Sequence, residues 1–195
     1  MIIGLTGSSG SGKSTVAAMF RAYECKIVDC DKLSREIDDL PEYKAAVREL
    51  LGDGAFDGDG NVDRRAIGKI VFGNDALLAK LTSISHPLII ARVVEDVKKF
   101  GNADVVIDAP LLFESGLDKI CDTTVGVIAK AKERARRVSH RDGITMKDAT
   151  RRVSLQESID FYKKNCIFII KNNGTTEELE KEFASVAAKI GLGGK

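Results

Sequence analysis

Residues 7–14 read Gly-Ser-Ser-Gly-Ser-Gly-Lys-Ser and match the phosphate-binding pattern G-x-x-x-x-G-K-[ST] at every fixed position. The apolar run Ile2–Leu5 precedes this loop. Ser14–Tyr23 follows it, with apolar residues spaced for one face of a helix. A strand, a glycine-rich loop and a helix in this order predict an α/β fold that holds a phosphorylated ligand.

Each residue type in the loop has a chemical reason to be there. Glycines let backbone N–H groups turn toward phosphate oxygens, and the amino terminus of the helix adds the positive end of its dipole. Lys13 supplies a point charge for the β- and γ-phosphates, and the Ser14 hydroxyl is expected to reach a bridging Mg²⁺. We therefore expect ATP and Mg²⁺ as cofactors. The residues expected to hold ATP in this loop are Ser9, Gly10, Ser11, Gly12, Lys13, Ser14 and Thr15.

Short apolar runs recur along the chain, each separated from the next by enough residues for a helix. This alternation predicts a parallel sheet with helices on its faces, and 195 residues suffice for one such domain, 1–195. The predicted strands are Ile2–Leu5, Lys26–Val28, Asp104–Ile107, Thr123–Ile128 and Ile167–Ile170.

The stretch 32–100 is much longer than one crossover connection needs. It contains helical patterns at Tyr43–Leu51 and Leu88–Phe100, so we expect a helical insertion. Between these patterns, 52–63 is rich in Gly and Asp and predicts a turn-dense loop. Its Asp and Gly residues suggest a calcium-binding loop. The EF-hand pattern needs a glutamate at the twelfth position, however, and this segment does not match it, so calcium is not expected.

Positive charge is concentrated in one segment. The chain has 30 Lys and Arg against 29 Asp and Glu, a net charge of +1, which gives no global field for nucleic acid or an anionic membrane. From Lys130 to Arg152, however, nine basic residues face three acids, in what should be two helices broken near Asp142–Gly143. Apolar spacing over Thr176–Ile190 predicts a closing amphipathic helix.

We expect no stretch to be long and apolar enough to span a membrane, which takes about 18 residues, and the amino terminus lacks signal-peptide character. We therefore expect a cytosolic protein. The four cysteines are scattered without metal-ligand spacing and are expected to be reduced and mostly buried.

Two carboxylates follow the second predicted strand, in Val28-Asp29-Cys30-Asp31. Ligands of open α/β sheets bind at the carboxyl ends of strands, and a period of two puts Asp29 and Asp31 on one side. A kinase needs a base for the acceptor hydroxyl and a carboxylate near Mg²⁺. We assign Asp31 the first role and Asp29 the second, while either could instead cap the following helix.

A third acid, Asp108, ends the run Asp104–Ile107. Proteins with this phosphate loop often carry a magnesium-facing Asp at such a position, although a turn residue at a strand end would look the same.

Several separated motifs resemble the dephospho-coenzyme A kinase family over almost the whole chain. The opening is similar to GLTG-x-x-GSGKST-V, the second strand to D-x-D-x-x-x-R, and the middle to R-x-x-[LI]-x-x-[IV]-V-F and I-x-HP-x-I. Later segments are similar to PLLFE and to the lid run R-x-x-x-RDG. Arg134, where the family commonly has Gln, and Cys166-Ile167, where it has Ala-Asp, depart from the pattern. The matching positions are Asp29, Asp31, Arg35, Arg64 to Phe72, Ile84, His86, Pro87, Ile89, Pro110 to Glu114, Arg137, Arg141 to Gly143, Gln156, Asn173 and Gly174.

The resemblance implies a three-layer fold with a five-stranded parallel sheet, a coenzyme A-binding insertion at 32–100 and a small helical lid at 134–158. It implies transfer of a phosphoryl group from ATP to the ribose 3′-hydroxyl of dephospho-coenzyme A, the last step of coenzyme A synthesis. The small-molecule acceptor is the partner expected, with no nucleic acid and no membrane, and the sequence leaves the oligomeric state open. The substrate-binding residues implied are Asp31, Arg35, Arg64, His86, Pro110, Leu111 and Glu114.

The lid arginines Arg137 and Arg141 are expected to bind ATP, with Arg141 neutralising charge on the transferred group. A solvated helix face would also carry such arginines. His86 precedes Pro87, which suits the first turn of a helix, so His86 either contacts substrate or simply precedes that helix. Arg35 and Arg64 either hold substrate phosphates or lie on a helical surface.

Two other functions remain open at this level. Another nucleotide or small-molecule kinase would share the loop and the lid but not the PLLFE and HP segments. An ATP-driven switch would need loops coupled to the γ-phosphate rather than a substrate-sized insertion.

Overall fold

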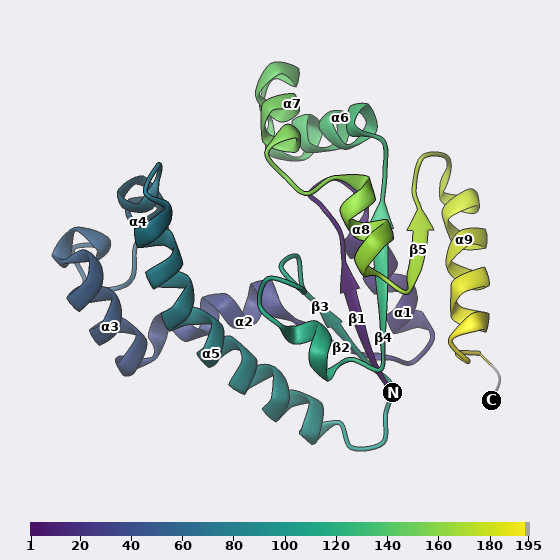
Figure 1. The fold of residues 1–195 in the computed structure, drawn as a ribbon, viewed down its shortest axis with the longest axis horizontal. Helices are drawn as coiled ribbons and strands as arrows, with labels where there is room; N and C mark the ends of the chain where they lie inside the picture. Colours follow the sequence, from purple (N-terminus) through teal and green to yellow (C-terminus); the bar gives the residue numbers. More distant parts are fainter. Residues whose placement is uncertain (194–195) are drawn as a thin grey trace. The chain divides into compact units, whose positions relative to one another are not determined.

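The structure, a computed structural model, describes residues 1–193 and divides into two compact units. The first unit contains Met1–Val28 and the chain from Phe100 onward, and the second is Asp29–Lys99. Figure 1 shows how the elements follow one another along the chain.

The first unit is built on a five-stranded sheet of order β2-β3-β1-β4-β5. β1 pairs in parallel with β3 and β4, and β4 pairs in parallel with β5. The predicted α/β fold with a five-stranded parallel sheet is therefore confirmed, and each predicted strand is right to within one residue at either end. The strands are β1 Ile2–Thr6, β2 Lys26–Asp29, β3 Val105–Asp108, β4 Thr123–Ile128 and β5 Phe168–Lys171.

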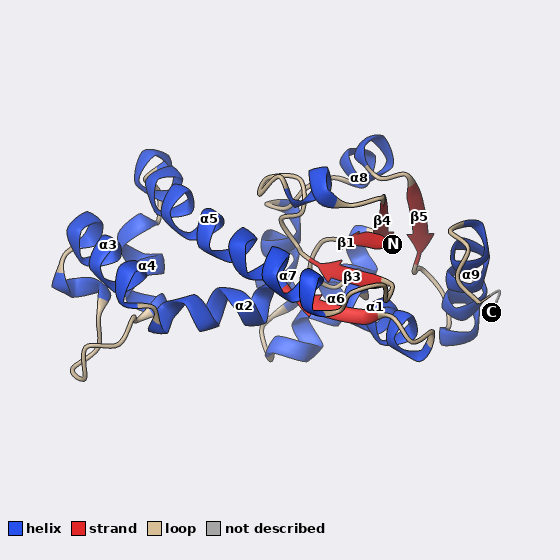
Figure 2. Ribbon diagram, turned by 90° about the horizontal axis from the view of Figure 1, so that it is seen from below, coloured by secondary structure: helices blue, strands red, loops and turns tan. Residues whose placement is uncertain are grey.

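The two faces of the sheet have separate apolar cores, because successive side chains of a strand point to opposite faces. Val127 and Ile170 pack with α1 (Lys13–Ala22) and α9 (Thr176–Lys189). The neighbouring Ile128 and Ile169 pack instead with α8 (Ile159–Asn165). In Figure 2 the strands lie between α8 and α1, so the first unit has the predicted three layers.

Two helices that follow β4 form a small helical pair. α6 (Ala131–Asp142) and α7 (Met146–Ser154) share an apolar core with Val138 and Val153 at its centre. Gly143 ends α6 in a left-handed conformation, with φ of 64°. The predicted break near Asp142–Gly143 is confirmed.

The second unit consists of helices around one apolar core. Residues 1–193 also contain three short 3₁₀ turns, two of them in this unit. The helices of the second unit are α2 Cys30–Glu36, α3 Pro41–Leu51, α4 Arg64–Val71 and α5 Asp75–Lys99, and the 3₁₀ turns are Ile37–Asp39, Asp53–Ala55 and Leu117–Ile120.

The loop at 52–63 is the tight turn that its composition predicts. The Asp57 carboxylate accepts backbone hydrogen bonds from Asp59 and Asn61, at 3.0 and 2.8 Å, and these bonds lower the pKa of Asp57. Its oxygens therefore hold the turn together.

The predicted helix start at His86-Pro87 is wrong, because Pro87 lies inside the 25-residue helix α5. Apolar residues on both sides of the proline, among them Leu81, Ile84 and Leu88, pack into the core of the second unit. This continuous packing outweighs the cost of the backbone hydrogen bond that proline cannot donate.

The expectation that no segment is apolar enough to span a membrane also needs correction. By length and composition α5 could cross one, since an 18-residue window has a mean hydropathy of 1.4, and 11% of that window is buried. Such a helix is weak evidence for a span, because helices that pack in protein cores pass the same test. The core contacts of Leu81, Ile84, Leu88 and Ile89 account for part of its apolar character.

Candidate active site

The phosphate loop connects β1 to α1 and depends on glycine at two crowded positions. Gly10 and Gly12 have φ of 78° and 94°, a region that side chains rarely adopt. A Cβ on Gly10 would lie 2.6 Å from the Arg134 carbonyl oxygen, and one on Gly12 would overlap the Asn172 side chain. The pattern therefore has glycines where both the backbone conformation and the lack of space demand them.

Lys13 is paired with Asp108. The Lys13 ammonium forms an ion pair with the Asp108 carboxylate, and the two side chains are only 14% and 10% exposed. Asp108 ends β3 and lies opposite Leu5 of β1, so the parallel register brings it to the edge from which the loop starts. Because this ion pair is only slightly exposed to water, its charges are weakly screened. The ammonium can pair with a phosphate instead, and the carboxylate with a cation.

Carbonyl groups of the loop accept hydrogen bonds from side chains elsewhere in the chain. The Arg137 guanidinium donates to the carbonyl oxygens of Gly10 and Ser11, at 3.2 and 3.4 Å, and to that of Asn172 at 3.0 Å. Asn172 Nδ2 donates to the Ser11 carbonyl at 2.8 Å. The structure thus places Arg137 against the loop.

Asn172, which is 7% exposed, was not predicted as a site residue from the sequence. Its position directly after the last strand was the available signal, because parallel strands deliver the residues that follow them to the ligand-binding edge of the sheet.

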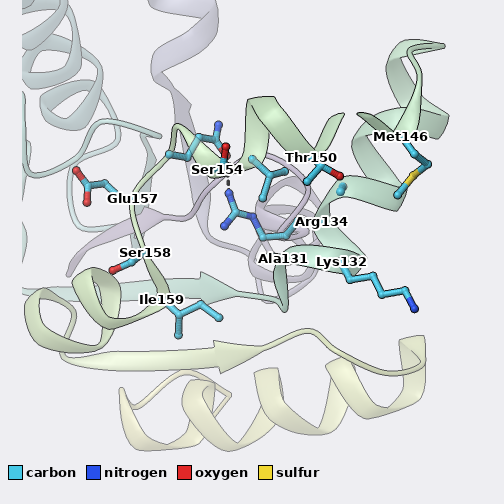
Figure 3. Close-up of a pocket in the computed structure, with 12 residues that line it drawn as sticks. Ala131, Lys132, Arg134, Met146, Thr150, Ser154, Glu157, Ser158 and Ile159 are labelled. Carbon is cyan, nitrogen blue, oxygen red and sulfur yellow. Dashed lines mark hydrogen bonds between the residues drawn. The ribbon is translucent and has the colours of Figure 1, made fainter. Parts of the chain in front are cut away.

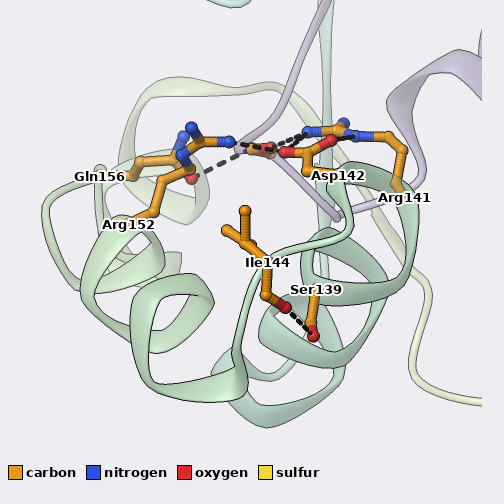
Figure 4. Close-up of polar contacts among 7 residues, drawn as sticks. Ser139, Arg141, Asp142, Ile144, Arg152 and Gln156 are labelled. Atoms are coloured by element: carbon orange, nitrogen blue, oxygen red, sulfur yellow. Dashed lines mark hydrogen bonds and ion pairs between the residues drawn. The ribbon is translucent and has the colours of Figure 1, made fainter.

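Arg141 lies at the end of α6 and touches the loop through a side chain. Its Nη2 donates to the Ser9 hydroxyl at 3.2 Å, and its Nε donates to Asp142 at 2.6 Å. Asp142 also accepts from Arg152 of α7 at 2.5 Å, which joins the two helices (Figure 4). The hydrogen bond to Asp142 raises the pKa of Arg141, which therefore keeps its charge.

A cavity of about 630 Å³ lies between α6, α7 and the start of α8 (Figure 3). Apolar side chains such as Ala135, Val153 and Ile159 line much of it, and Arg134 and Gln156 line it as well. The cavity adjoins the loop, because Arg134 also bonds to Ser9.

The two early acids have different positions in the second unit. Asp29 caps α2 and accepts the Lys32 N–H at 3.0 Å, whereas Asp31 is an exposed residue in the first turn of that helix. The period-two argument that put them on one side is wrong, because the strand ends at Asp29 and a helix begins at Cys30. The alternative of a helix cap thus applies to Asp29, whose capping bond does not exclude a second role.

Arg35 and Arg64 are both exposed. Arg64 is paired with Asp38, with Nε 2.5 Å from Oδ2, and it also donates to the Ser34 carbonyl. It lines a cavity of about 250 Å³ in the second unit together with Tyr43 and Ser85. Burial, and then the nearby Asp38 carboxylate, raise the pKa of Tyr43, which stays a neutral hydroxyl.

His86 is half-buried within α5, one residue beyond Ser85. The structure thus places it on a helix next to a residue that lines the cavity of the second unit.

The segment after β3 carries the remaining expected substrate contacts. The Thr6 hydroxyl donates to the Pro110 carbonyl at 3.1 Å, which ties this segment to the end of β1. Leu111 is 54% exposed and Glu114 is exposed. An exposed leucine and carboxylate beside the loop are available to a ligand.

The oxygen donors at the loop fit Mg²⁺, which proteins usually hold through one or two side chains together with substrate phosphates and water. The Ser14 hydroxyl at the start of α1 is exposed, and the Asp108 carboxylate lies beside Lys13. Among residues 1–193 no group of three or more His, Cys, Asp or Glu is arranged as a metal site. The donor set therefore suits a cation that arrives with a nucleotide.

Comparison with known proteins agrees with this geometry. The family model for dephospho-CoA kinase matches residues 1–178. The chain is similar to a dephospho-CoA kinase of Fusobacterium nucleatum, with 36% identity over 93% of this chain and 94% of that protein. The crystal structure of TT1252 from Thermus thermophilus superposes with a TM-score of 0.84 and 31% identity, covering 97% of both chains.

A more distant structure, dephospho-CoA kinase from Campylobacter jejuni, shares the fold, with a TM-score of 0.70 at 24% identity over 97% of this chain and 96% of that one. A phosphate loop, a parallel sheet and a family match over most of the length all agree with the resemblance seen in the sequence. The chain belongs to the dephospho-CoA kinase family.

Proposed function

We propose that this kinase transfers the γ-phosphoryl group of ATP to the ribose 3′-hydroxyl of dephospho-CoA, giving CoA and ADP as the last step of CoA synthesis. The observation that carries the proposal is the complete phosphate loop with its Lys13–Asp108 pair, in a chain that matches the family over residues 1–178. We also propose that the enzyme is cytoplasmic and acts on a small molecule, with neither nucleic acid nor a membrane as a partner.

The loop residues 9–15 would hold the phosphates of ATP through their backbone N–H groups and the Lys13 ammonium. Ser14 and Asp108, with Asp29 as a further candidate, would hold Mg²⁺, which supplies charge neutralisation between the β- and γ-phosphates. Arg141 would place its guanidinium beside the γ-phosphoryl group, where negative charge spreads over the equatorial oxygens during transfer. Arg137 would add positive charge at the same edge of the loop.

Asp31 would accept the proton of the 3′-hydroxyl. The hydroxyl oxygen attacks the γ-phosphorus, and the bond between that phosphorus and the ADP oxygen breaks. Asp31 is exposed in the first turn of α2, so a bound acceptor can reach its carboxylate.

We propose acceptor contacts in each unit of the chain. Arg35, Arg64 and His86 are the proposed contacts in the second unit, where the cavity beside Arg64 has an apolar floor and hydroxyl groups. Guanidinium groups suit the diphosphate of dephospho-CoA, and an apolar floor suits its uncharged portions. Pro110, Leu111 and Glu114 are the proposed contacts in the first unit.

The lid at 134–158 and the insertion at 32–100 would close over the two ligands and exclude water, which would otherwise compete with the acceptor hydroxyl.

The runner-up is another nucleotide or small-molecule kinase, which would keep the loop and the lid but phosphorylate a different hydroxyl. An ATP-driven switch would hydrolyse ATP without any acceptor.

The decisive experiment mixes the purified protein with Mg-ATP and dephospho-CoA, with AMP and shikimate as decoy acceptors. ADP formation is followed and the product is identified by mass. The proposal expects ADP and CoA only with dephospho-CoA. Turnover with a decoy would indicate a different kinase, and ADP release without any acceptor would indicate a switch.

A further inference from the structure

Arg134 is a charged residue that is almost completely buried, with 5% of its surface exposed. It lies in the first turn of α6, beside the phosphate loop. Its Nε donates to the Ser9 carbonyl at 3.2 Å, and its Nη2 donates to Gln156 Oε1 at 2.6 Å. Burying a guanidinium is costly, so its persistence here needs a compensating interaction.

Gln156 completes a closed arrangement around Ser9. The same Oε1 that accepts from Arg134 also accepts the backbone N–H of Ser9, at 3.1 Å. Both backbone polar groups of Ser9 are therefore held by two side chains that bond to each other. A peptide unit restrained at both ends in this way has a fixed orientation.

The charge of Arg134 is not neutralised by an acidic side chain. Within residues 1–193, no carboxylate lies within ion-pair distance of its guanidinium, and its hydrogen-bond acceptors are a carbonyl and an amide. A buried cation with neutral partners favours an anion nearby, because its field is weakly screened. The phosphate loop is the adjacent anion-binding element, so a bound phosphate would supply the missing counter-charge.

We infer that Arg134 and Gln156 are positioning residues that set the orientation of Ser9 and thereby the affinity of the loop for the β-phosphate of a nucleotide. They link the loop to α6 and to the segment after α7, from opposite ends of that helical pair. The inference rests on the proposed binding of ATP at this loop, but it does not depend on the identity of the acceptor.

The test compares Arg134→Met with the matched control Arg136→Met, in the same helix but with a side chain that is 71% exposed. Calorimetric titration gives the affinity of each full-length protein for ADP and AMP. Losing hydrogen bonds to a charged group should weaken ADP binding about 10-fold or more in Arg134→Met. AMP binding should weaken much less, because AMP lacks the β-phosphate. Arg136→Met should match the wild type for both.

A second pair of variants keeps the test decisive if Arg134→Met does not fold. Gln156→Met removes the acceptor at nearly constant size, whereas Gln156→Glu keeps an acceptor oxygen for both Arg134 and the Ser9 N–H. We expect Gln156→Met to lose the preference for ADP over AMP. Gln156→Glu should keep the orientation of Ser9 but bind ADP less tightly than the wild type, because its carboxylate would neutralise Arg134 and repel phosphate.

An unchanged ratio of ADP to AMP affinity in a folded Arg134→Met or Gln156→Met protein would overturn the inference, even if its melting temperature fell, because that result would mean a purely structural role. Failure of dephospho-CoA as acceptor would reject the proposed function while leaving this nucleotide-binding test intact.

Discussion

Asp29 and Asp31 are two residues apart, but their surroundings differ. Asp29 caps α2 through the Lys32 N–H, while Asp31 lies exposed in the first turn of that helix. Substituting each residue by its isosteric amide separates the role of charge from the role of a hydrogen-bond acceptor, because Asn caps helices about as well as Asp.

We expect Asp31→Asn to lower kcat by about 10²- to 10⁴-fold through loss of the base, without a change in melting temperature. Asp29→Asn should remain stable, whereas Asp29→Ala should lose about 1 kcal/mol of stability with the cap. Steady-state kinetics and thermal unfolding check both residues. A large drop of kcat in Asp29→Asn alone would reverse the assignment and make Asp29 the chemically important acid.

The buried thiols predict a pH dependence of stability. Burial raises the pKa of Cys121 and of Cys166 to about 12. In the unfolded chain a thiol has a pKa of about 8.5, which is lower than in the folded state. The folded state therefore binds the thiol protons more tightly. The stability that these thiols contribute is fully present below about pH 8.5 and is lost as the pH rises toward 12.

We therefore expect the free energy of unfolding to fall more steeply between about pH 9 and 11 in the wild type than in a Cys121→Ala/Cys166→Ala variant. Urea denaturation at several pH values measures the two slopes. Other titrating groups act equally in both proteins, so identical slopes would show that these thiols do not contribute.

At the level of elements, α9 shows how one sequence signal sets a helix boundary. The Thr175 hydroxyl accepts the Glu178 N–H at 3.3 Å, and the Glu178 carboxylate accepts the Thr175 N–H at 3.2 Å. The helix then buries Leu179 and Phe183 against the sheet. This reciprocal capping fixes the first turn of a helix that closes the core.

Thr175→Ala should cost about 1 kcal/mol and lower the melting temperature by roughly 2–4 °C, with kinase activity unchanged. Thr175→Ser is the matched control, because it keeps the capping oxygen and should melt near the wild type. Equal melting of the Ala and Ser variants would mean that the cap contributes no measurable stability.

Elements with strong periodicity were predictable from the sequence, and those governed by tertiary packing were not. The strands and α1 follow from short apolar runs and the loop pattern, whereas the first half of α5 was missed because His86-Pro87 resembles a helix start. The contacts of Arg134 and Asn172 with the phosphate loop were not predicted, for a similar reason. Burial of a polar side chain depends on backbone groups brought there by other elements, which no local pattern encodes.

For the whole molecule, the proposed closure over two ligands predicts protection from amide exchange that depends on which ligand is present. We expect a non-hydrolysable ATP analogue to slow amide exchange in the loop 7–15 and in α6–α7, and dephospho-CoA to slow it in the second unit. Both ligands together should protect more than the sum of the two. Exchange followed by mass spectrometry checks this, with α9 as an internal reference, and equal exchange with and without both ligands would contradict closure.

The close approach of Gly10 to the backbone of Arg134 has a mechanical consequence. A Cβ at Gly10 would lie 2.6 Å from the Arg134 carbonyl oxygen, so the two main chains touch without intervening side chains. Such a close contact leaves little room for the two main chains to move past each other. If α6 and α7 move when a nucleotide binds, the first turn of α6 is therefore expected to move least.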